Sequence, residues 1–260
     1  MSDLVVVGGG KMGEALVGGL INGGWAPASA ITVVEPVASR RAELAARFSG
    51  LAVSAEPVVA SGALVAVKPQ HVAGVCRSLG QLGVVRILSI AAGVRLAAME
   101  AELPPGVAVV RAMPNTPALV GAGAAAIASG AAATEADLEW AEGILGAVGT
   151  VVRVSEEQLD AVTGLSGSGP AYVFLVAEAL IDAGVRQGLT RAVASELTVQ
   201  TLRGAAELLA TGQSAAELRA AVTSPGGTTA AGLHVLESAA IRAAFAEAVA
   251  AATERSRQLG

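Results

Sequence analysis

A run of valines leads directly into a glycine-rich turn, Val5-Val6-Val7-Gly8-Gly9-Gly10-Lys11-Met12-Gly13. β-Branched residues favour a strand, and the apolar spacing after this run is that of a helix. Gly8, Gly10 and Gly13 then suit three tasks: a tight turn, close approach of a pyrophosphate to the backbone, and close packing of helix on strand. The start of the helix adds free N–H groups and the positive end of its dipole. This run therefore predicts a dinucleotide site.

The first 154 residues alternate between β-branched runs and alanine-rich helical runs. We expect strands at residues 4–7, 31–35, 64–67, 85–90, 107–111 and 151–154. Helices are expected at residues 12–21, 40–48 and 71–79, with a further helix after the capping box at Thr134. Strands that alternate with helices imply crossover connections, hence a Rossmann-type, doubly wound parallel sheet. Continuous apolar strands fit a sheet that is covered on both faces.

The pattern changes at Ser155, where a second capping box begins and β-rich runs almost cease. Helices are expected from Pro170 to residue 183 and at residues 191–209, 215–221 and 237–258. The chain thus divides into a dinucleotide-binding domain, residues 1–154, and an all-helical domain, residues 155–260. Two of these helical runs are apolar on more than one face, which requires burial on all sides. We therefore predict at least a homodimer through the helical domain.

Composition excludes several classes of protein. A net charge of −5 and 2% aromatic residues argue against a nucleic-acid partner. The single Cys76 excludes a disulfide scaffold, and no Cys/His cluster predicts a metal site. A mean hydropathy of +0.61 raises the question of a membrane span, but Pro114, Asn115 and Pro117 interrupt the longest uncharged stretch. We expect a cytoplasmic protein that binds a small-molecule substrate and neither membrane nor nucleic acid.

The end of the second expected strand bears on the choice of cofactor. Glu35 follows Gly13 at the distance where an acidic residue binds a ribose 2′-hydroxyl, which favours NADH. Arg40 and Arg41 come soon afterwards and can hold a 2′-phosphate, which favours NADPH. Both arginines can equally be the solvated start of a helix, so the sequence leaves NADPH and NADH as alternatives.

Other candidates follow the carboxyl ends of strands, the edge where doubly wound sheets bind ligands. Lys11 lies in the glycine turn, and Lys68 follows the third expected strand. Small residues and prolines after the next two strands leave room for a flat nicotinamide ring. The expected cofactor-binding residues are Gly8, Gly10, Lys11, Met12, Gly13, Glu35, Arg40, Val67, Lys68, Pro69, Ala91, Ala92, Gly93, Pro114 and Asn115.

Four motifs together resemble the pyrroline-5-carboxylate reductase family, over nearly the whole chain. They are Val67-Lys-Pro-Gln70, Met113-Pro-Asn-Thr-Pro117, Leu165-Ser-Gly-Ser-Gly-Pro-Ala-Tyr172 and Val222-Thr-Ser-Pro-Gly-Gly-Thr-Thr229. The resemblance implies reduction of a cyclic imine to L-proline, the last step of proline biosynthesis, by hydride from NADPH or NADH. It also implies a Rossmann domain followed by a helical domain that pairs with a second subunit, with the substrate near that interface. Lys11 departs from the family, in which many members carry an uncharged residue.

The resemblance implies a substrate site at the last of these motifs. It places the substrate carboxylate on backbone N–H groups and a hydroxyl of Ser224, Gly226, Gly227 and Thr228. It places the Thr229 hydroxyl at the ring nitrogen, as the catalytic group. The residues themselves agree, because a Gly-Gly turn before a helix collects N–H groups into an anion site. An imine also protonates far more readily than a carbonyl, so no strong general acid is needed.

Two other functions fit a dinucleotide-binding domain joined to a helical one. A 3-hydroxyacid dehydrogenase requires a catalytic lysine on the first long interdomain helix, and residues 166–200 contain none. A non-catalytic nucleotide sensor would bind the cofactor without turnover, and it has no use for a second anion-binding turn. Both alternatives therefore explain less of the sequence than an imine reductase does.

Overall fold

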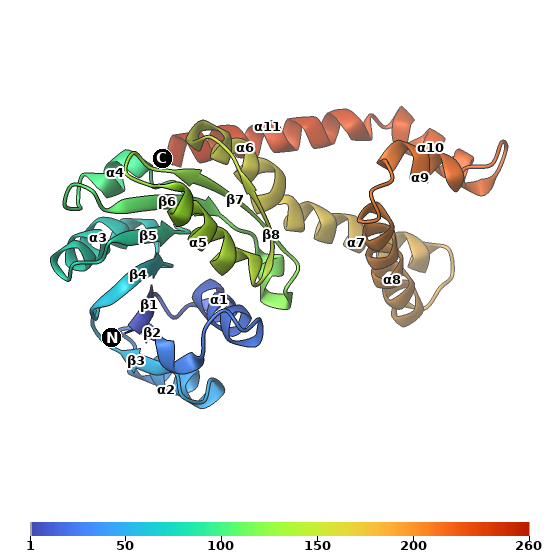
Figure 1. Ribbon diagram of the computed structural model, residues 1–260. Helices are drawn as coiled ribbons and strands as arrows, with labels where there is room; N and C mark the ends of the chain where they lie inside the picture. The colour runs from blue at the N-terminus through green and yellow to red at the C-terminus, as the bar shows by residue number, and fades with distance from the viewer. Residues whose placement is uncertain (1, 260) are drawn as a thin grey trace. The chain divides into compact units, whose positions relative to one another are not determined.

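The computed structural model describes residues 2–259, which form two compact units (Figure 1). The first, here called the sheet unit, comprises the described residues up to Ser168 together with those from Ala250 onward. The second, here called the helical unit, is Gly169–Val249. The predicted domain boundary after residue 154 differs from this division, because residues 155–168 and 250–259 pack with the sheet.

The sheet unit is built on one eight-stranded sheet. Its strands lie in the order β3-β2-β1-β4-β5-β6-β7-β8, and every neighbouring pair is parallel except β6 and β7. The predicted doubly wound sheet is confirmed, with β7 and β8 running antiparallel to the other six strands. The strands are β1 Ser2–Val7, β2 Ile31–Val34, β3 Ala52–Ser54, β4 Ala60–Val65, β5 Arg86–Ser89, β6 Ala108–Met113, β7 Gly123–Ser129 and β8 Gly149–Arg153.

Helices cover both faces of this sheet (Figure 1). One face packs against α1 Lys11–Asn22, α2 Ala38–Arg47 and α5 Glu135–Gly146. The other packs against α3 Val72–Gln81, α4 Leu96–Glu100 and the short α6 Leu159–Val162. Short turns complete the unit, namely η1 Ala28–Ala30, η2 Pro69–His71, η3 Thr116–Val120, η4 Glu156–Gln158 and the π-helical η5 Thr163–Gly167.

The central strand β1 shows why the valine run folds in this way. Leu4 and Val6 belong to one core cluster, whereas Val5 and Val7 belong to the cluster on the opposite face. All four side chains are buried, and each contributes about 1.5–3 kcal/mol through burial. Cys76 is also fully buried and belongs to this core as a small apolar side chain.

Strands β3 and β7 are absent from the sequence-based expectation. β7 has the sequence Gly-Ala-Ala-Ala-Ile-Ala-Ser, and alanine has a low intrinsic preference for strands. It pairs antiparallel with β6 and parallel with β8, so hydrogen bonds to these neighbouring strands stabilise it despite its low strand preference. The uncharged stretch that raised the membrane question thus contains η3 and this sheet strand.

The helical unit contains α7 Gly169–Arg186, α8 Arg191–Leu209, α9 Ala215–Ala221, α10 Thr228–Ser238 and the first part of α11 Ile241–Leu259. The single helix expected at residues 237–258 is wrong at its start, because Ala240 adopts a φ of 55° and separates α10 from α11. Large apolar side chains of these helices are exposed in the single chain, among them Phe174, Leu175 and Leu197.

The segment Glu156–Arg186 has the length and the apolar composition of a membrane-spanning helix, and only 6% of its most apolar window is buried. The π-helical turn η5 lies within it. Apolar helices that are buried between subunits have the same length and composition, because obligate interfaces resemble a protein core.

Candidate functional site

The turn between β1 and α1 has the geometry that its three glycines predict. Gly8 has a φ of +111°, and a Cβ there would lie 2.5 Å from the Ala66 carbonyl oxygen. A Cβ on Gly13 would collide with the Gly8 carbonyl, so α1 can pack closely on β1 only with glycine there. Gly10 instead faces open space and begins α1 without a side-chain cap. The first N–H groups of α1 are therefore available to an anion.

A cavity of about 700 Å³ lies at the carboxyl ends of β1, β2 and β4. The strand order reverses between β1 and β4, because β2 and β3 lie on one side of β1 and β4 and β5 on the other. Ligands of doubly wound sheets bind at such a switch point. Five of the expected cofactor residues line the cavity, namely Gly8, Gly10, Glu35, Val67 and Lys68. Several lining residues escaped the sequence analysis, including Pro36, Ala55, Pro57, Gln70, His71, Val75 and Ser78. Gln70 is the last residue of the Val67-Lys-Pro-Gln70 motif and His71 directly follows it, so this motif was the available signal.

Glu35 is fixed at the edge of this cavity. One carboxylate oxygen accepts a hydrogen bond from the Gly9 N–H at 3.1 Å, and the other accepts one from the Val37 N–H at 3.0 Å. Each oxygen keeps a free lone pair for a further donor. The Glu35 carboxylate is thus held in place with acceptor capacity to spare.

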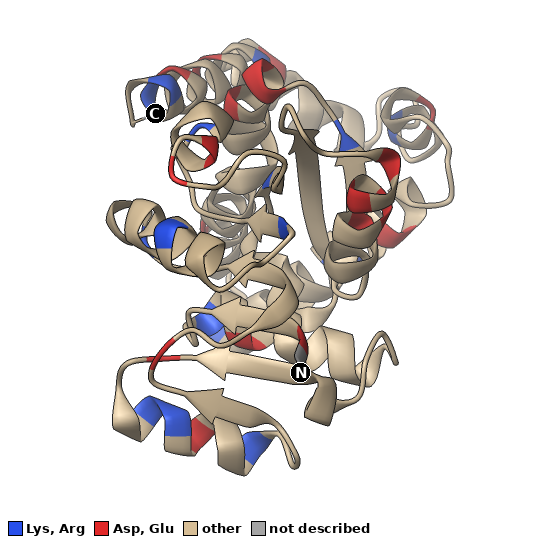
Figure 2. Ribbon diagram, turned by 60° about the vertical axis from the view of Figure 1, so that its left-hand side comes forward, with Lys and Arg blue, Asp and Glu red and all other residues tan. Residues whose placement is uncertain are grey.

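Arg40 links α1 to α2 through hydrogen bonds and ion pairs. Its Nε donates to the Gly9 carbonyl at 2.7 Å, and its terminal nitrogens pair with Glu14 and Glu43. Burial alone would raise the pKa of Glu14, but the hydrogen bonds and charges of Arg40 and Arg47 hold it below its usual value. Acidic and basic residues accordingly lie side by side along α2 (Figure 2). The Arg40 side chain is 25% exposed and paired with carboxylates, so it is not a freely solvated residue, and it does not line the cavity.

The remaining expected cofactor residues lie outside the lining of this cavity. Lys11 is exposed beside Gly10, Met12 is half-buried, and Pro69 opens η2. Ala91 is buried, Ala92 is exposed, and Gly93 has a φ of +74° in the loop after β5.

Pro114 and Asn115 are buried after β6. The Asn115 Oδ1 accepts from the Ala124 N–H at 2.9 Å, and its Nδ2 donates to the Ser166 carbonyl at 3.0 Å. These two bonds make Asn115 a support for the loop, which sequence alone does not reveal.

The second glycine turn lies in the helical unit, between α9 and α10. The Gly227 N–H donates to the Ser224 carbonyl at 3.1 Å, and Gly226 has a φ of +69°. Gly227 begins α10 without a side-chain cap, whereas Thr190 and Ser214 cap α8 and α9. The unit thus brings Ser224, Gly226, Gly227, Thr228 and Thr229 together at one helix start.

The hydroxyls of this turn have no hydrogen-bond partner within the described part of the chain, neither at Ser224 nor at Thr228 and Thr229. Ser224 and Thr228 are exposed, and Thr229 is half-buried. A Cβ on Gly227 would collide with the Ser224 Oγ, so only glycine keeps this hydroxyl beside the start of α10. Free hydroxyls and free N–H groups at one point can bind a carboxylate.

Known families match both parts of the chain. The domain described as "Pyrroline-5-carboxylate reductase dimerisation" matches residues 156–259, and "NADP oxidoreductase coenzyme F420-dependent" matches residues 3–93. The first match begins close to the predicted start of the helical domain.

Relatives match over almost their full length. The pyrroline-5-carboxylate reductase of Mycobacterium tuberculosis is 44% identical over 100% of this chain and 97% of its own. The enzyme of Synechocystis sp. is 46% identical over 99% of this chain and 98% of its own.

Solved structures of similar enzymes match the fold of this chain. A pyrroline-5-carboxylate reductase from Coxiella burnetii has a TM-score of 0.94 and 37% identity, over 100% of this chain and 98% of its own. The Plasmodium falciparum pyrroline carboxylate reductase with NADP bound has a TM-score of 0.85 and 30% identity, with the same coverage. These matches confirm the resemblance that the four motifs indicated, together with the expected nicotinamide cofactor chemistry. The chain belongs to the pyrroline-5-carboxylate reductase family.

Proposed function

We propose that this chain reduces 1-pyrroline-5-carboxylate to L-proline with a hydride from NADPH or NADH. The observation that carries this proposal is the uncapped Ser224–Thr229 turn in a member of this family. Glycine turns such as residues 8–13 occur in many dehydrogenases, whereas a second anion-binding turn suits a substrate that is itself a carboxylate.

The sheet unit supplies the groups that would hold the cofactor. The N–H groups at Gly10 and the start of α1 suit the pyrophosphate, and the Glu35 carboxylate suits a ribose hydroxyl. Lys68 lies exposed in the same cavity, within which a positive charge favours phosphate. The small residues 91–93 and Pro114 would receive the nicotinamide ring. The bound cofactor supplies the hydride.

The helical unit supplies the groups that would hold the substrate. The backbone N–H groups around Gly226–Thr228 and the Ser224 hydroxyl suit the carboxylate of the substrate. The Thr229 hydroxyl would accept a hydrogen bond from the protonated ring nitrogen and so fix the orientation of the C=N bond. The nitrogen already carries its proton in the protonated imine, so transfer of one hydride to the carbon converts this bond into the CH–NH of proline.

Turnover tests the proposal directly. Purified protein mixed with 1-pyrroline-5-carboxylate should consume NADH or NADPH, as measured by the loss of reduced-nicotinamide absorbance, and proline should appear in equal amount. Tight binding of the cofactor without turnover would contradict the proposal and favour the nucleotide-sensing alternative.

The cofactor preference should depend on Glu35. We expect Glu35→Gln to shift the ratio of NADPH to NADH affinity by at least about tenfold toward NADPH, because the variant loses a negative charge that repels a 2′-phosphate. Titration calorimetry with both cofactors measures this ratio. Glu43→Gln, which removes an exposed carboxylate from the same corner, is the matched control. An unchanged ratio in Glu35→Gln would place the ribose elsewhere.

Self-association follows from the dimerisation domain and from the exposed apolar helices. We expect light scattering to give the mass of a homodimer at micromolar concentration, or of a larger ring of such dimers. Burial of residues such as Phe174 and Leu175 against a second copy removes apolar surface from water. A monomer mass would contradict this prediction. We further propose that the protein acts in the cytoplasm, on a small-molecule substrate.

A further inference from the structure

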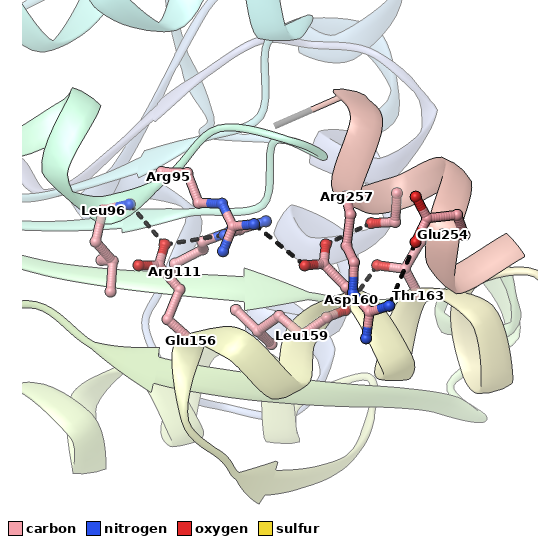
Figure 3. A network of polar contacts seen from close by, with 10 residues as sticks. Arg95, Leu96, Arg111, Glu156, Leu159, Asp160, Thr163, Glu254 and Arg257 are labelled. Atoms are coloured by element: carbon pink, nitrogen blue, oxygen red, sulfur yellow. Dashed lines mark hydrogen bonds and ion pairs between the residues drawn. The ribbon is translucent and has the colours of Figure 1, made fainter. Parts of the chain in front are cut away.

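Polar contacts hold the end of α11 to the sheet unit. We call residues 253–259 the closing turn. Thr253 and Ser256 lie on one face of this turn and are both buried. The Ser256 Oγ donates a hydrogen bond at 2.8 Å to Asp160 on α6. Asp160 is labelled in Figure 3. The Asp160 side chain is only 4% exposed, so this bond lies inside the protein.

Asp160 also reaches the loop that follows β5. Its second carboxylate oxygen accepts from an Arg95 nitrogen at 3.3 Å. Arg95 stands two residues after Gly93 and is the N-cap of α4 (Figure 3). A single buried carboxylate therefore joins the closing turn to the end of the loop at residues 91–93.

Glu156 joins the same loop to strand β6. One of its oxygens accepts from the Leu96 N–H at 2.7 Å and from the buried Arg111 at 2.9 Å. Arg111 lies in β6 shortly before Pro114. The network thus ends two residues after the loop at 91–93 and three residues before Pro114, beside the two segments that are expected to receive the nicotinamide ring.

The closing turn also touches this loop directly. Gly93 has a φ of +74°, and a Cβ built on it would lie 3.0 Å from the Leu259 carbonyl oxygen. Backbone therefore packs on backbone at this point. Ala91, Ala92 and Gly93 carry no side chains long enough to fix their own loop, so its position must come from neighbouring groups.

We propose that the closing turn of α11 positions the loop at residues 91–93 for hydride transfer, with Asp160 and Ser256 as positioning residues. A loop with small side chains admits the ring but does not orient it, and a displacement of about 1 Å at a reacting centre can cost about a hundredfold in rate. The Asp160 carboxylate fixes the loop because it is buried, charged and bound from both sides. The inference rests on the proposed function only in placing the nicotinamide ring at this loop.

Two ligands separate positioning of the ring from general loosening of the site. NADH carries the nicotinamide ring, whereas ADP-ribose lacks it and depends on the glycine turn, Glu35 and Lys68. We expect Ser256→Ala and Asp160→Asn to weaken NADH binding about three- to tenfold in calorimetry, with ADP-ribose binding unchanged. We expect kcat to fall by about tenfold or more, because the ring is held less accurately. Ser256→Thr, which keeps the hydroxyl, should restore NADH affinity.

Two control variants match these changes. Glu254→Gln breaks an exposed ion pair with Arg257 on the closing turn itself, and Ser61→Ala removes a serine hydrogen bond at 2.7 Å elsewhere in the sheet unit. Neither control should alter NADH affinity or kcat.

Equal weakening of both ligands in Ser256→Ala, or no change in NADH binding and kcat, would overturn the inference. If Asp160→Asn does not fold, the Ser256→Ala and Ser256→Thr pair decides. The binding measurements need no substrate. A wild-type protein without turnover would therefore contradict the proposed function, while the difference between NADH and ADP-ribose would still decide the inference.

Discussion

Replacement of Gly8 with alanine should strongly weaken cofactor binding. The positive φ of this residue costs an alanine about 1–2 kcal/mol, and its Cβ would lie 2.5 Å from the Ala66 carbonyl, which belongs to rigid backbone after β4. The turn must open to relieve this contact, and the N–H groups at the start of α1 then lose their arrangement. We expect NADH affinity to fall at least about a hundredfold, which corresponds to about 2.8 kcal/mol. Titration calorimetry measures this loss.

Gly106→Ala is the matched control for this experiment. Gly106 has a φ of +93°, but a Cβ there meets no atom within 4 Å. Its replacement should lower the free energy of unfolding through backbone strain alone and leave NADH affinity unchanged. If Gly8→Ala binds NADH as the wild type does, the glycine turn is not the pyrophosphate site.

Replacement of Thr229 with alanine should have the second large effect, on turnover. The Thr229 hydroxyl has no partner within residues 2–259, so its loss costs little stability. If it orients the protonated ring nitrogen, we expect kcat/KM for 1-pyrroline-5-carboxylate to fall about a hundredfold while NADH affinity stays unchanged. Steady-state kinetics with calorimetry measures both quantities.

Thr229→Ser is the conservative variant and should retain most of the activity, because it keeps the hydroxyl. Thr211→Ala removes the same group from an exposed turn in the helical unit, and it should leave kcat/KM unchanged. Wild-type turnover in Thr229→Ala would preserve the proposed reaction and remove this role of Thr229.

The sequence predicted the features that depend on local patterns. The valine run at residues 4–7, the glycine spacing and the capping boxes at Thr134 and Ser155 all correspond to observed elements. Each of these rests on interactions within a few residues, and such interactions can be inferred from residue types alone.

Features that depend on contacts between distant segments could not be predicted. β7 is a strand because β6 and β8 pair with it, although its alanines favour other structure. Arg40 forms ion pairs with Glu14 and Glu43. Asn115 holds the loop after β6 through hydrogen bonds to the backbone of Ala124 and Ser166. The type of residue was informative in each case, but its partner is set by tertiary packing.

The insertion of the helical unit between Ser168 and Ala250 has a consequence for synthesis of the chain. Residues 250–259 leave the ribosome after the entire helical unit, yet Ser256 and Leu259 contact residues of the sheet unit. Domains generally fold as they emerge, and contacts that join distant segments form late. A nascent chain that is arrested before residue 250 should therefore already protect β1 and β4 from proteolysis, while the loop after β5 becomes resistant to cleavage only when synthesis has passed α11.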